Sequence, residues 1–272
     1  MKISAHFLTI AALQGAAAFN VGGPQAVRRS FALSQKSPPP GMAPISMMAD
    51  ALASPCWDMS EITPDGSLMQ RVEGKTRKTW KFNDLSQDRV QVAVVSEGRP
   101  VHADIQLWLG PDWTPFSLKA YSEDGKARPI QTLVGTRNKA AMIEVRNVGE
   151  YEFPVQAASN YAKGAMVLVP QDIPATTPAT RVDGGARRSF PLDPITQQLE
   201  VVLNTDGKQL NARVEILNGP NNQKQTFEVF TNNGMLNSLC VCFNTPDAGN
   251  TVRIINLAPV EFPCYIHLNE KA

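Results

Sequence analysis

An internal repeat constrains this chain more than any other feature. Offsetting the sequence against itself by 109 positions aligns residues 89–158 with residues 198–267 without a gap. The apolar pattern is kept throughout, and the identical residues fall where backbone geometry is demanding. These anchors are Gly98 with Gly207, Gly110 and Pro111 with Gly219 and Pro220, and Glu152, Phe153 and Pro154 with Glu261, Phe262 and Pro263. We interpret the repeat as an old duplication of one folding unit.

Each copy has the pattern of short β-strands. Apolar residues recur with a period of two, as at Val90, Val92 and Val94, and turn signals such as Asp206-Gly207 separate the runs. A glycine after Asp takes the positive φ that a tight hairpin requires. Six or seven strands a copy, with no long helical pattern, predict an all-β protein made of two tandem, homologous antiparallel β-sandwich domains that form a pseudo-symmetric pair.

The composition along the chain predicts its division. We expect an irregular lead-in over residues 49–77, one sandwich over 78–159 and the second over 187–272. Residues 160–186, rich in Pro and Gly, are expected to be a linker, in which 165–169 could add an edge strand.

The N-terminus has the pattern of a targeting sequence. Residues 1–18 contain Lys2 and an apolar stretch that ends in small residues, which is typical of a secretory signal peptide. Residues 19–48 carry Arg28, Arg29 and Lys36 but no acid, since the first acidic residue is Asp50. Together they resemble the bipartite presequence of proteins sent to the complex plastids of diatoms. The alternative is an ordinary secretory signal before a disordered start of the mature chain.

Charge, hydropathy and cysteine spacing limit the classes of protein to which this chain can belong. The chain has 26 Lys and Arg against 25 Asp and Glu, and removing the presequence leaves it slightly acidic, so no nucleic-acid partner is indicated. Beyond residues 3–19 no apolar run is long enough to span a bilayer. Cys240 and Cys242 lie two apart on one predicted strand and cannot easily bridge each other. We expect Cys56, Cys240, Cys242 and Cys264 to be free, mostly buried thiols.

The residues that usually carry chemistry are sparse. His102 and His267 occupy non-equivalent positions in the two copies, and no cluster has the spacing of a metal site. Nucleophile elbows, phosphate-binding loops and zinc-protease motifs are missing as well. We therefore predict no catalytic, cofactor-binding or metal-binding residues and no enzyme activity.

The repeated Glu-Phe-Pro tripeptide has two interpretations. As a functional motif it would be a docking epitope present twice. As structure, which we favour, Phe153 and Phe262 would fill the core, the prolines would fix an edge or bulge, and Glu152 and Glu261 would satisfy a turn.

Large apolar residues are predicted on outward faces of the sheets. Strand alternation from core positions such as Leu118 places them there, at equivalent places in both copies. Such a surface is unusual for a lone soluble domain, so either the rest of the chain or another subunit should cover it. These candidate assembly or inter-domain residues are Trp108, Tyr121, Leu133, Leu217, Phe230 and Cys242.

Four features together point to a known family: the plastid-type presequence, the duplicated sandwich, the Gly-Pro and Glu-Phe-Pro anchors, and the absence of catalytic motifs. With these features the chain resembles the pyrenoid shell proteins of diatoms, over about residues 78–269. The resemblance implies a structural protein without cofactors that assembles with itself into a sheet around the Rubisco-filled pyrenoid, at the pyrenoid periphery in the plastid stroma. Rubisco and other pyrenoid proteins are the implied partners.

Two other classes are weighed beside this one. A carbohydrate-binding module would use surface aromatics such as Trp108, Trp113 and Tyr121 as stacking platforms, but the second copy has Leu217 and Asn222 in place of the two tryptophans. An enzyme with an unrecognised site is the third, because convergent sites assemble from distant residues.

Overall fold

The computed structural model describes residues 68–162 and 179–272, and within them every regular element is a β-strand. In the first half these are β1 (Gln70–Val72), β2 (Arg77–Phe82), β3 (Arg89–Val95), β4 (Val101–Trp108), β5 (Phe116–Ser122), β6 (Ile130–Gly135), β7 (Ala141–Asn147) and β8 (Val155–Tyr161). In the second half they are β9 (Thr180–Val182), β10 (Arg187–Pro191), β11 (Gln198–Asn204), β12 (Leu210–Asn218), β13 (Gln223–Thr231), β14 (Leu239–Asn244), β15 (Asn250–Asn256) and β16 (Cys264–Lys271). A search of these residues finds no helix able to cross a membrane.

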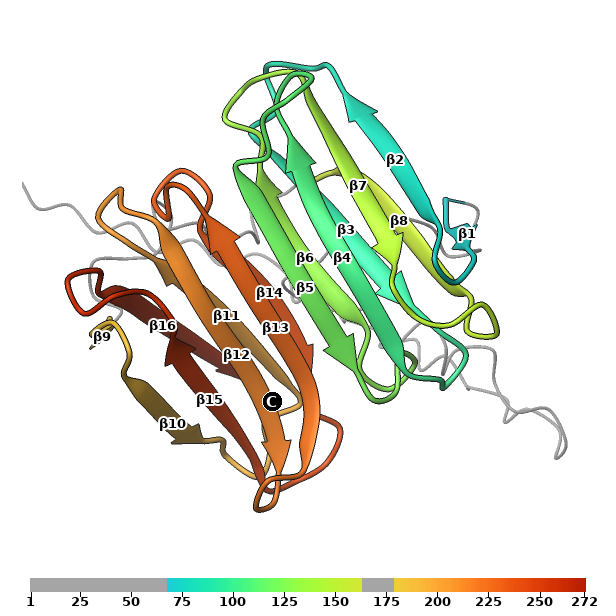
Figure 1. The fold of residues 1–272 in the computed structure, drawn as a ribbon. Coiled ribbons are helices and arrows are strands. Elements are labelled where there is room, and N and C mark those ends of the chain that lie inside the picture. The colour runs from blue at the N-terminus through green and yellow to red at the C-terminus, as the bar shows by residue number, and fades with distance from the viewer. Residues whose placement is uncertain (1–67, 163–178) are drawn as a thin grey trace, which may run out of the picture. The chain divides into compact units, whose positions relative to one another are not determined.

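The strands form two antiparallel sheets of eight strands each (Figure 1). Sheet I has the order β1-β8-β3-β6-β14-β11-β16-β9, and sheet II has the order β10-β15-β12-β13-β5-β4-β7-β2. The prediction of an all-β antiparallel sandwich is confirmed. The sequence did not predict that both sheets would run without a break through the two halves.

One hydrophobic core lies between the sheets. Strand alternation in sheet II turns residues such as Leu118 and Phe227 inward, where both are fully buried. The ring of Phe227 meets that of Phe243 from sheet I edge-on, with centroids 4.9 Å apart. A single buried cluster includes residues from both halves. Since each fully buried aromatic or aliphatic side chain stabilises the fold by about 1.5–3 kcal/mol, this shared core holds the halves together.

The halves meet along a line that we call the seam, where β5 pairs with β13 and β6 pairs with β14. The register of β5 and β13 extends from Phe116 opposite Thr231 to Ser122 opposite Gln225. In both sheets, each strand of the first half stands as far from the seam as the strand eight numbers later. A pseudo-symmetric pair would have this order, and the symmetry itself stays a prediction.

Two edge strands lie in segments that were expected to be irregular. β1 pairs with β8 and β9 pairs with β16, each through three residues. An offset of 110 positions, one more than in the rest of the repeat, aligns Arg71-Val72-x-Gly74 with Arg181-Val182-x-Gly184. A Cβ at Gly74 or Gly184 would collide with a backbone carbonyl of the neighbouring loop. The predicted presequence, most of the lead-in and residues 165–169 lie outside the described residues.

Candidate assembly surfaces

The outer face of sheet II carries four of the predicted assembly residues. Trp108 and Tyr121 in the first half are half-buried, and Leu217 is buried in the second half. Phe230 is 48% exposed. Among the described residues the indole N–H of Trp108 is buried without a hydrogen-bond partner. The ring centroid of Tyr121 lies 4.8 Å from that of His102. None of the four belongs to the central core, and strand alternation turns all four to the outer face of sheet II.

The other two predicted residues lie on the outer face of sheet I, and both are buried. Leu133 packs there in a second apolar cluster with Cys240 and three other buried residues. Met69 and Ala162, which flank the segments that are not described, pack against this cluster. The six predicted residues therefore occupy two opposite faces of the sandwich. The sequence could not predict this, because strand alternation shows only that a side chain points away from the core. It does not show which sheet carries that side chain.

The cysteines differ from the expectation in one respect. Cys240 and Cys264 are buried thiols, whereas Cys242 is disulfide-bonded, so the prediction of a thiol is wrong for Cys242. Its neighbours Val241 and Phe243 face the core, which turns the Cys242 sulfur away from the core. Cys56 lies outside the described residues.

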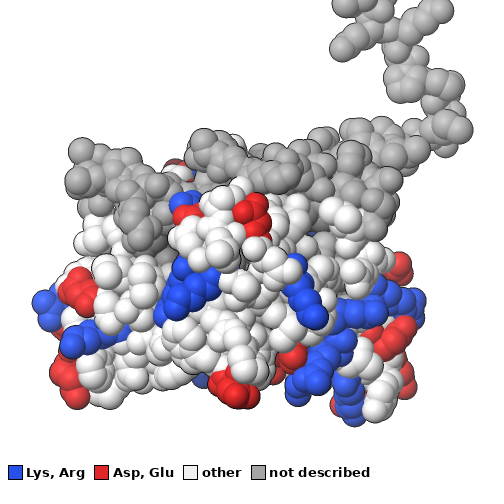
Figure 2. All heavy atoms as spheres, turned by 90° about the horizontal axis from the view of Figure 1, so that it is seen from above, with Lys and Arg blue, Asp and Glu red and all other residues white. Residues whose placement is uncertain are grey.

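A row of alternating charges crosses the outer face of sheet II. In the strand register Arg146 stands opposite Asp104, Asp104 opposite Lys119, Lys119 opposite Glu228, and Glu228 opposite Arg213. Burial raises the pKa of Asp104, while the neighbouring cations Lys119 and Arg146 act against this rise. Arg213 is ion-paired with Glu228 at 2.6 Å. Opposite charges on adjacent strands stabilise a sheet by about 0.2–1 kcal/mol a pair. On the side that Figure 2 shows, basic and acidic side chains are interspersed among the described residues.

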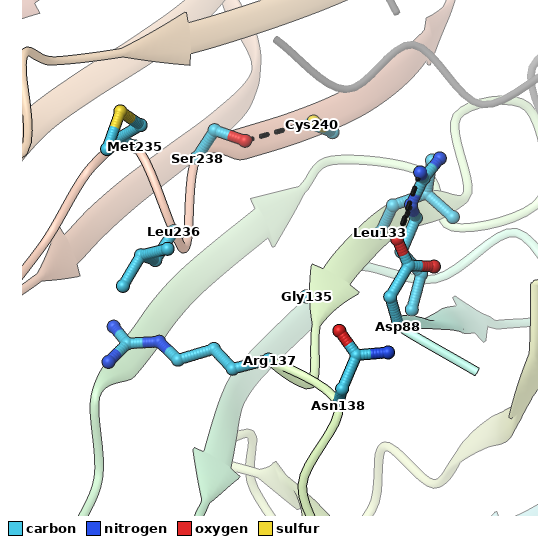
Figure 3. Close-up of a pocket in the computed structure, with 10 residues that line it drawn as sticks. Asp88, Leu133, Gly135, Arg137, Asn138, Met235, Leu236, Ser238 and Cys240 are labelled. Carbon is cyan, nitrogen blue, oxygen red and sulfur yellow. Dashed lines mark hydrogen bonds and ion pairs between the residues drawn. The ribbon is translucent and has the colours of Figure 1, made fainter. Parts of the chain in front are cut away.

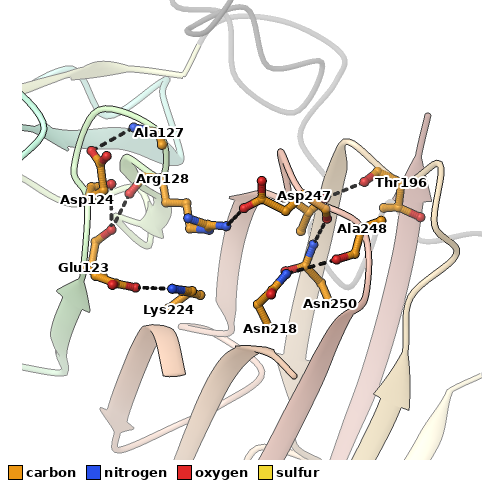
Figure 4. Close-up of polar contacts among 12 residues, drawn as sticks. Glu123, Asp124, Ala127, Arg128, Thr196, Asn218, Lys224, Asp247, Ala248 and Asn250 are labelled. Carbon is orange, nitrogen blue, oxygen red and sulfur yellow. Dashed lines mark hydrogen bonds and ion pairs between the residues drawn. The ribbon is translucent and has the colours of Figure 1, made fainter. Parts of the chain in front are cut away.

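Polar contacts tie the two halves together at one end of the seam (Figure 4). Arg128 of the first half donates to the carboxylate of Asp247 at 2.6 Å. Its side chain is only 6% exposed, whereas that of Asp247 is 61% exposed. Lys224 pairs with Glu123 at 2.7 Å. The amide of Gln225, which is fully buried, donates to the Arg128 carbonyl at 2.8 Å. These bonds fix the halves relative to each other at this end.

Different residues do the same at the other end of the seam. Arg137 donates to Asn237 at 2.6 Å and to Asn232 at 2.9 Å, and Asn237 donates to the carbonyl of Gly135 at 2.7 Å. A pocket of about 130 Å³ opens beside them (Figure 3), lined from both halves by residues that include Leu133, Gly135, Arg137, Met235, Leu236 and Cys240. The sequence could not predict these contacts, because they join loops about 100 residues apart.

The repeated anchors are structural in a way that differs from the expectation. Gly98, Gly110, Gly207 and Gly219 all have φ between 77° and 81°, which only glycine adopts without strain. However, Phe153 is 38% exposed and Phe262 is half-buried, so the prediction that these rings fill the core is wrong. The tripeptide lies in the loop between β7 and β8, and its counterpart lies in the loop between β15 and β16, so neither ring stands on a strand that turns it inward. No hydrogen bond to the carboxylate of Glu152 or Glu261 is seen among the described residues, although the Glu152 carbonyl accepts from Arg99 at 3.0 Å.

A buried asparagine holds this loop in each half. The amide of Asn147 donates to the carbonyls of Val72 in β1 and Phe153, at 3.1 and 2.8 Å, and its oxygen accepts from the N–H of Gly149. Asn256 repeats all three bonds with Val182 in β9, Phe262 and Ala258. The alignment of the two asparagines was visible in the sequence, but their role was missed because their partners lie up to 75 residues away.

The aromatic residues proposed as a sugar platform are not exposed together. Trp113 lies in the loop between β4 and β5, and the cations of Arg137 and Lys139 stand 5.0 and 5.7 Å from its ring centre. These cation–π contacts occupy a ring face that a stacked sugar would use.

His102 in β4 of sheet II and His267 in β16 of sheet I lie in different sheets. His267 lines a pocket of about 350 Å³ with Asn204, Asp206 and Tyr265. Its Nδ1 has no hydrogen-bond partner in the described part of the chain, and burial lowers the pKa of His267. Within residues 68–162 and 179–272, no three His, Cys, Asp or Glu side chains are grouped to hold a metal ion.

The fold and these surfaces define a β-sandwich protein with two hydrogen-bonded halves and one sheet face that carries charged and aromatic residues. The family model of the diatom pyrenoid shell protein matches residues 63–270. Because this match spans both halves and most of the chain, the chain belongs to the diatom pyrenoid shell protein family, and the resemblance seen in the sequence is confirmed.

Other comparisons add little. No curated protein matches the chain. Among solved structures, the crystal structure of the PBSX exported protein XepA is similar with a TM-score of 0.25 and 11% sequence identity, over 74% of this chain and 84% of that chain. A TM-score this low supports no conclusion about function.

Proposed function

We propose that this protein is a structural, non-enzymatic subunit that assembles with copies of itself into a sheet-like shell around the Rubisco-containing pyrenoid of a plastid, and thereby supports CO₂ concentration and fixation. The observation that carries this proposal is the match of residues 63–270 to the diatom pyrenoid shell protein family. The stromal location at the pyrenoid periphery, contact with Rubisco, and the division into copies at 78–159 and 187–272 belong to the same proposal.

The joined sheets support a role as a building block. A closed or extended assembly repeats the same contact many times, so small changes in subunit geometry would accumulate. Here the halves share hydrogen-bonded sheets and one core. An ion pair also bridges one end of the seam, and hydrogen bonds to side-chain amides bridge the other. A subunit braced in this way presents its contact surfaces at a constant spacing.

The edges of sheet II indicate how neighbours would meet. Both edge strands carry exposed cations, Arg77, Lys78 and Lys81 in β2 and Arg187 and Arg188 in β10. Cations on an edge oppose the addition of a further strand, particularly one that is itself basic. We therefore propose that subunits meet through side chains of their sheet faces, not by joining β2 to β10 of a neighbour.

Electron microscopy with sedimentation tests the assembly. The chain from residue 49 to 272 contains all the described strands, and we expect regular sheets or tubes as its concentration rises. Phe230→Lys should raise the concentration needed, because it places a charge on the outer face of sheet II. Leu236→Lys is the matched control, since Leu236 is equally exposed, at 47%, but lies in a loop at the seam. A monodisperse monomer under all conditions would contradict the proposal.

Such a monomer would favour the alternative of a ligand-binding module. Glycan-array binding that Trp113→Ala abolishes would support that alternative. The cations over the Trp113 ring make this outcome the less expected one.

A further inference from the structure

Charges on the outer face of sheet II are inverted between equivalent positions of the two halves. Asp104 aligns with Arg213 in the repeat, and Lys119 aligns with Glu228. All four side chains point away from the core, because their strand neighbours are core residues. They also lie in one row across the strands. A duplicated surface usually repeats its charges, so this inversion makes the two halves of the face complementary to each other.

The strand order shows which surface would match this pattern. β5 and β13 are the first strands on either side of the seam, and β4 and β12 are the second. A half-turn about an axis along the seam, lying in the plane of contact, brings a second copy face to face with the first. Lys119 of one copy then faces Glu228 of the other, and Asp104 faces Arg213. Each charge pair occurs twice in such a two-fold contact.

We propose that the outer face of sheet II binds the same face of a second copy of this chain, with β4, β5, β13 and β12 at the centre of the contact. This rests on the self-assembly proposed above and specifies one of its contacts, because it joins two subunits face to face through the surface that Phe230→Lys tests. Phe230 lies in the register next to the charge row, opposite Ser117, and adds exposed apolar area.

The contact should be confined to the central strands. The same half-turn brings Arg77 at one edge near Arg187 at the other, which are both basic. Adjacent strands in a sheet rotate by roughly 20–25°, so the outermost strands of two facing sheets diverge. The like charges at the edges are thereby kept apart while the central row is in register.

Mixing two charge-reversal variants tests the proposal. In chain 49–272, Asp104→Arg alone would place two arginines in contact, and Arg213→Asp alone would place two aspartates in contact. Mixed in equal amounts, the two variants restore an opposite-charge pair at both positions. Asp104 and Arg213 are separated by β5 and β13 within one chain, so mixing cannot repair an effect inside a single chain.

We expect analytical ultracentrifugation to show a dimer of the unchanged chain. Each variant alone should bind itself about tenfold more weakly or worse, since like charges facing each other are strongly unfavourable, and the mixture should return to nearly the original affinity. The dimer should also weaken between about 0.05 and 1 M salt, where the Debye length falls to about 3 Å. Lys81→Glu, on the exposed edge of the same face, is the control and should change little.

Other results would overturn the proposal. A mixture as weak as its components would show that the reversals act within each chain, and a dimer insensitive to salt would exclude the charge row. Circular dichroism checks that both variants fold; if either does not, the salt series on the unchanged chain decides. Sheets that grow normally while the mixture fails would remove this face-to-face contact and leave the proposed self-assembly standing.

Discussion

Asn147 and Asn256 occupy equivalent places in the two halves and hold the same three backbone groups with their side chains. Each amide donates to the carbonyl of an edge strand and to the carbonyl of the repeated phenylalanine, and each amide oxygen accepts a backbone N–H two residues on. Both side chains are 1% exposed. One buried amide thus attaches an edge strand of sheet I to the loop that follows a strand of sheet II, once in each half.

Replacing either asparagine with alanine should destabilise the protein by about 2–3 kcal/mol, because buried carbonyls would lose their donors without access to water. Urea denaturation at equilibrium measures this loss. Asn211→Ala, on the half-buried outer face of sheet II, is the matched control and should stay within about 0.5 kcal/mol. Unchanged stability in Asn147→Ala would show that the hydrogen bonds of Asn147 do not hold β1.

The two ion pairs at the seam, Arg128 with Asp247 and Lys224 with Glu123, should differ in how much they stabilise the protein. Asp247→Asn leaves the buried guanidinium of Arg128 without its carboxylate and should cost about 1–3 kcal/mol. Lys224→Ala breaks a more exposed pair with Glu123 and should cost no more than about 1 kcal/mol. Urea denaturation of both variants tests this order. Equal losses would mean that burial of Arg128 contributes nothing.

The repeated phenylalanine should tolerate truncation. Phe153→Ala should cost less than about 1.5 kcal/mol, because much of the ring already contacts water. Phe227→Ala should cost about 3–5 kcal/mol, because the ring is fully buried between the sheets. Thermal unfolding followed by circular dichroism distinguishes the two. A large loss in Phe153→Ala would reinstate the ring as a core residue.

Burial should make the Cys264 thiol unreactive, and its ionisation should make the stability of the protein depend on pH. Its pKa is raised from 9.0 to about 11 because burial disfavours the thiolate. The protonated thiol therefore contributes stability that is complete below about pH 9 and is lost as the pH rises to about 11. The stability of the unchanged chain should fall more steeply over this range than that of Cys264→Ala. Parallel curves would contradict the raised pKa.

The sequence predicted the parts of this fold that depend on local rules. A period of two identified most strands, such as β3 with Val90, Val92 and Val94 turned inward. Glycine at Gly98 and Gly207 marked turns, because positive φ is strained for other residues. The short strands β1 and β9 were not predicted, since three residues are too few to show a period. The predicted burial of Phe153 was wrong because a loop has no strand alternation to follow.

What the sequence alone determined is the all-β class, the repeat and the family, because periodicity, turn residues and repeated anchors are recorded residue by residue. Only the tertiary structure decided that β5 pairs with β13 and β6 with β14, which joins two predicted sandwiches into continuous sheets. It also separated Leu133 and Cys242 from Trp108, Tyr121, Leu217 and Phe230, and placed Lys119 beside Glu228. These relationships join residues about 100 positions apart. Their free energy comes from burial and pairing in three dimensions, which no local pattern records.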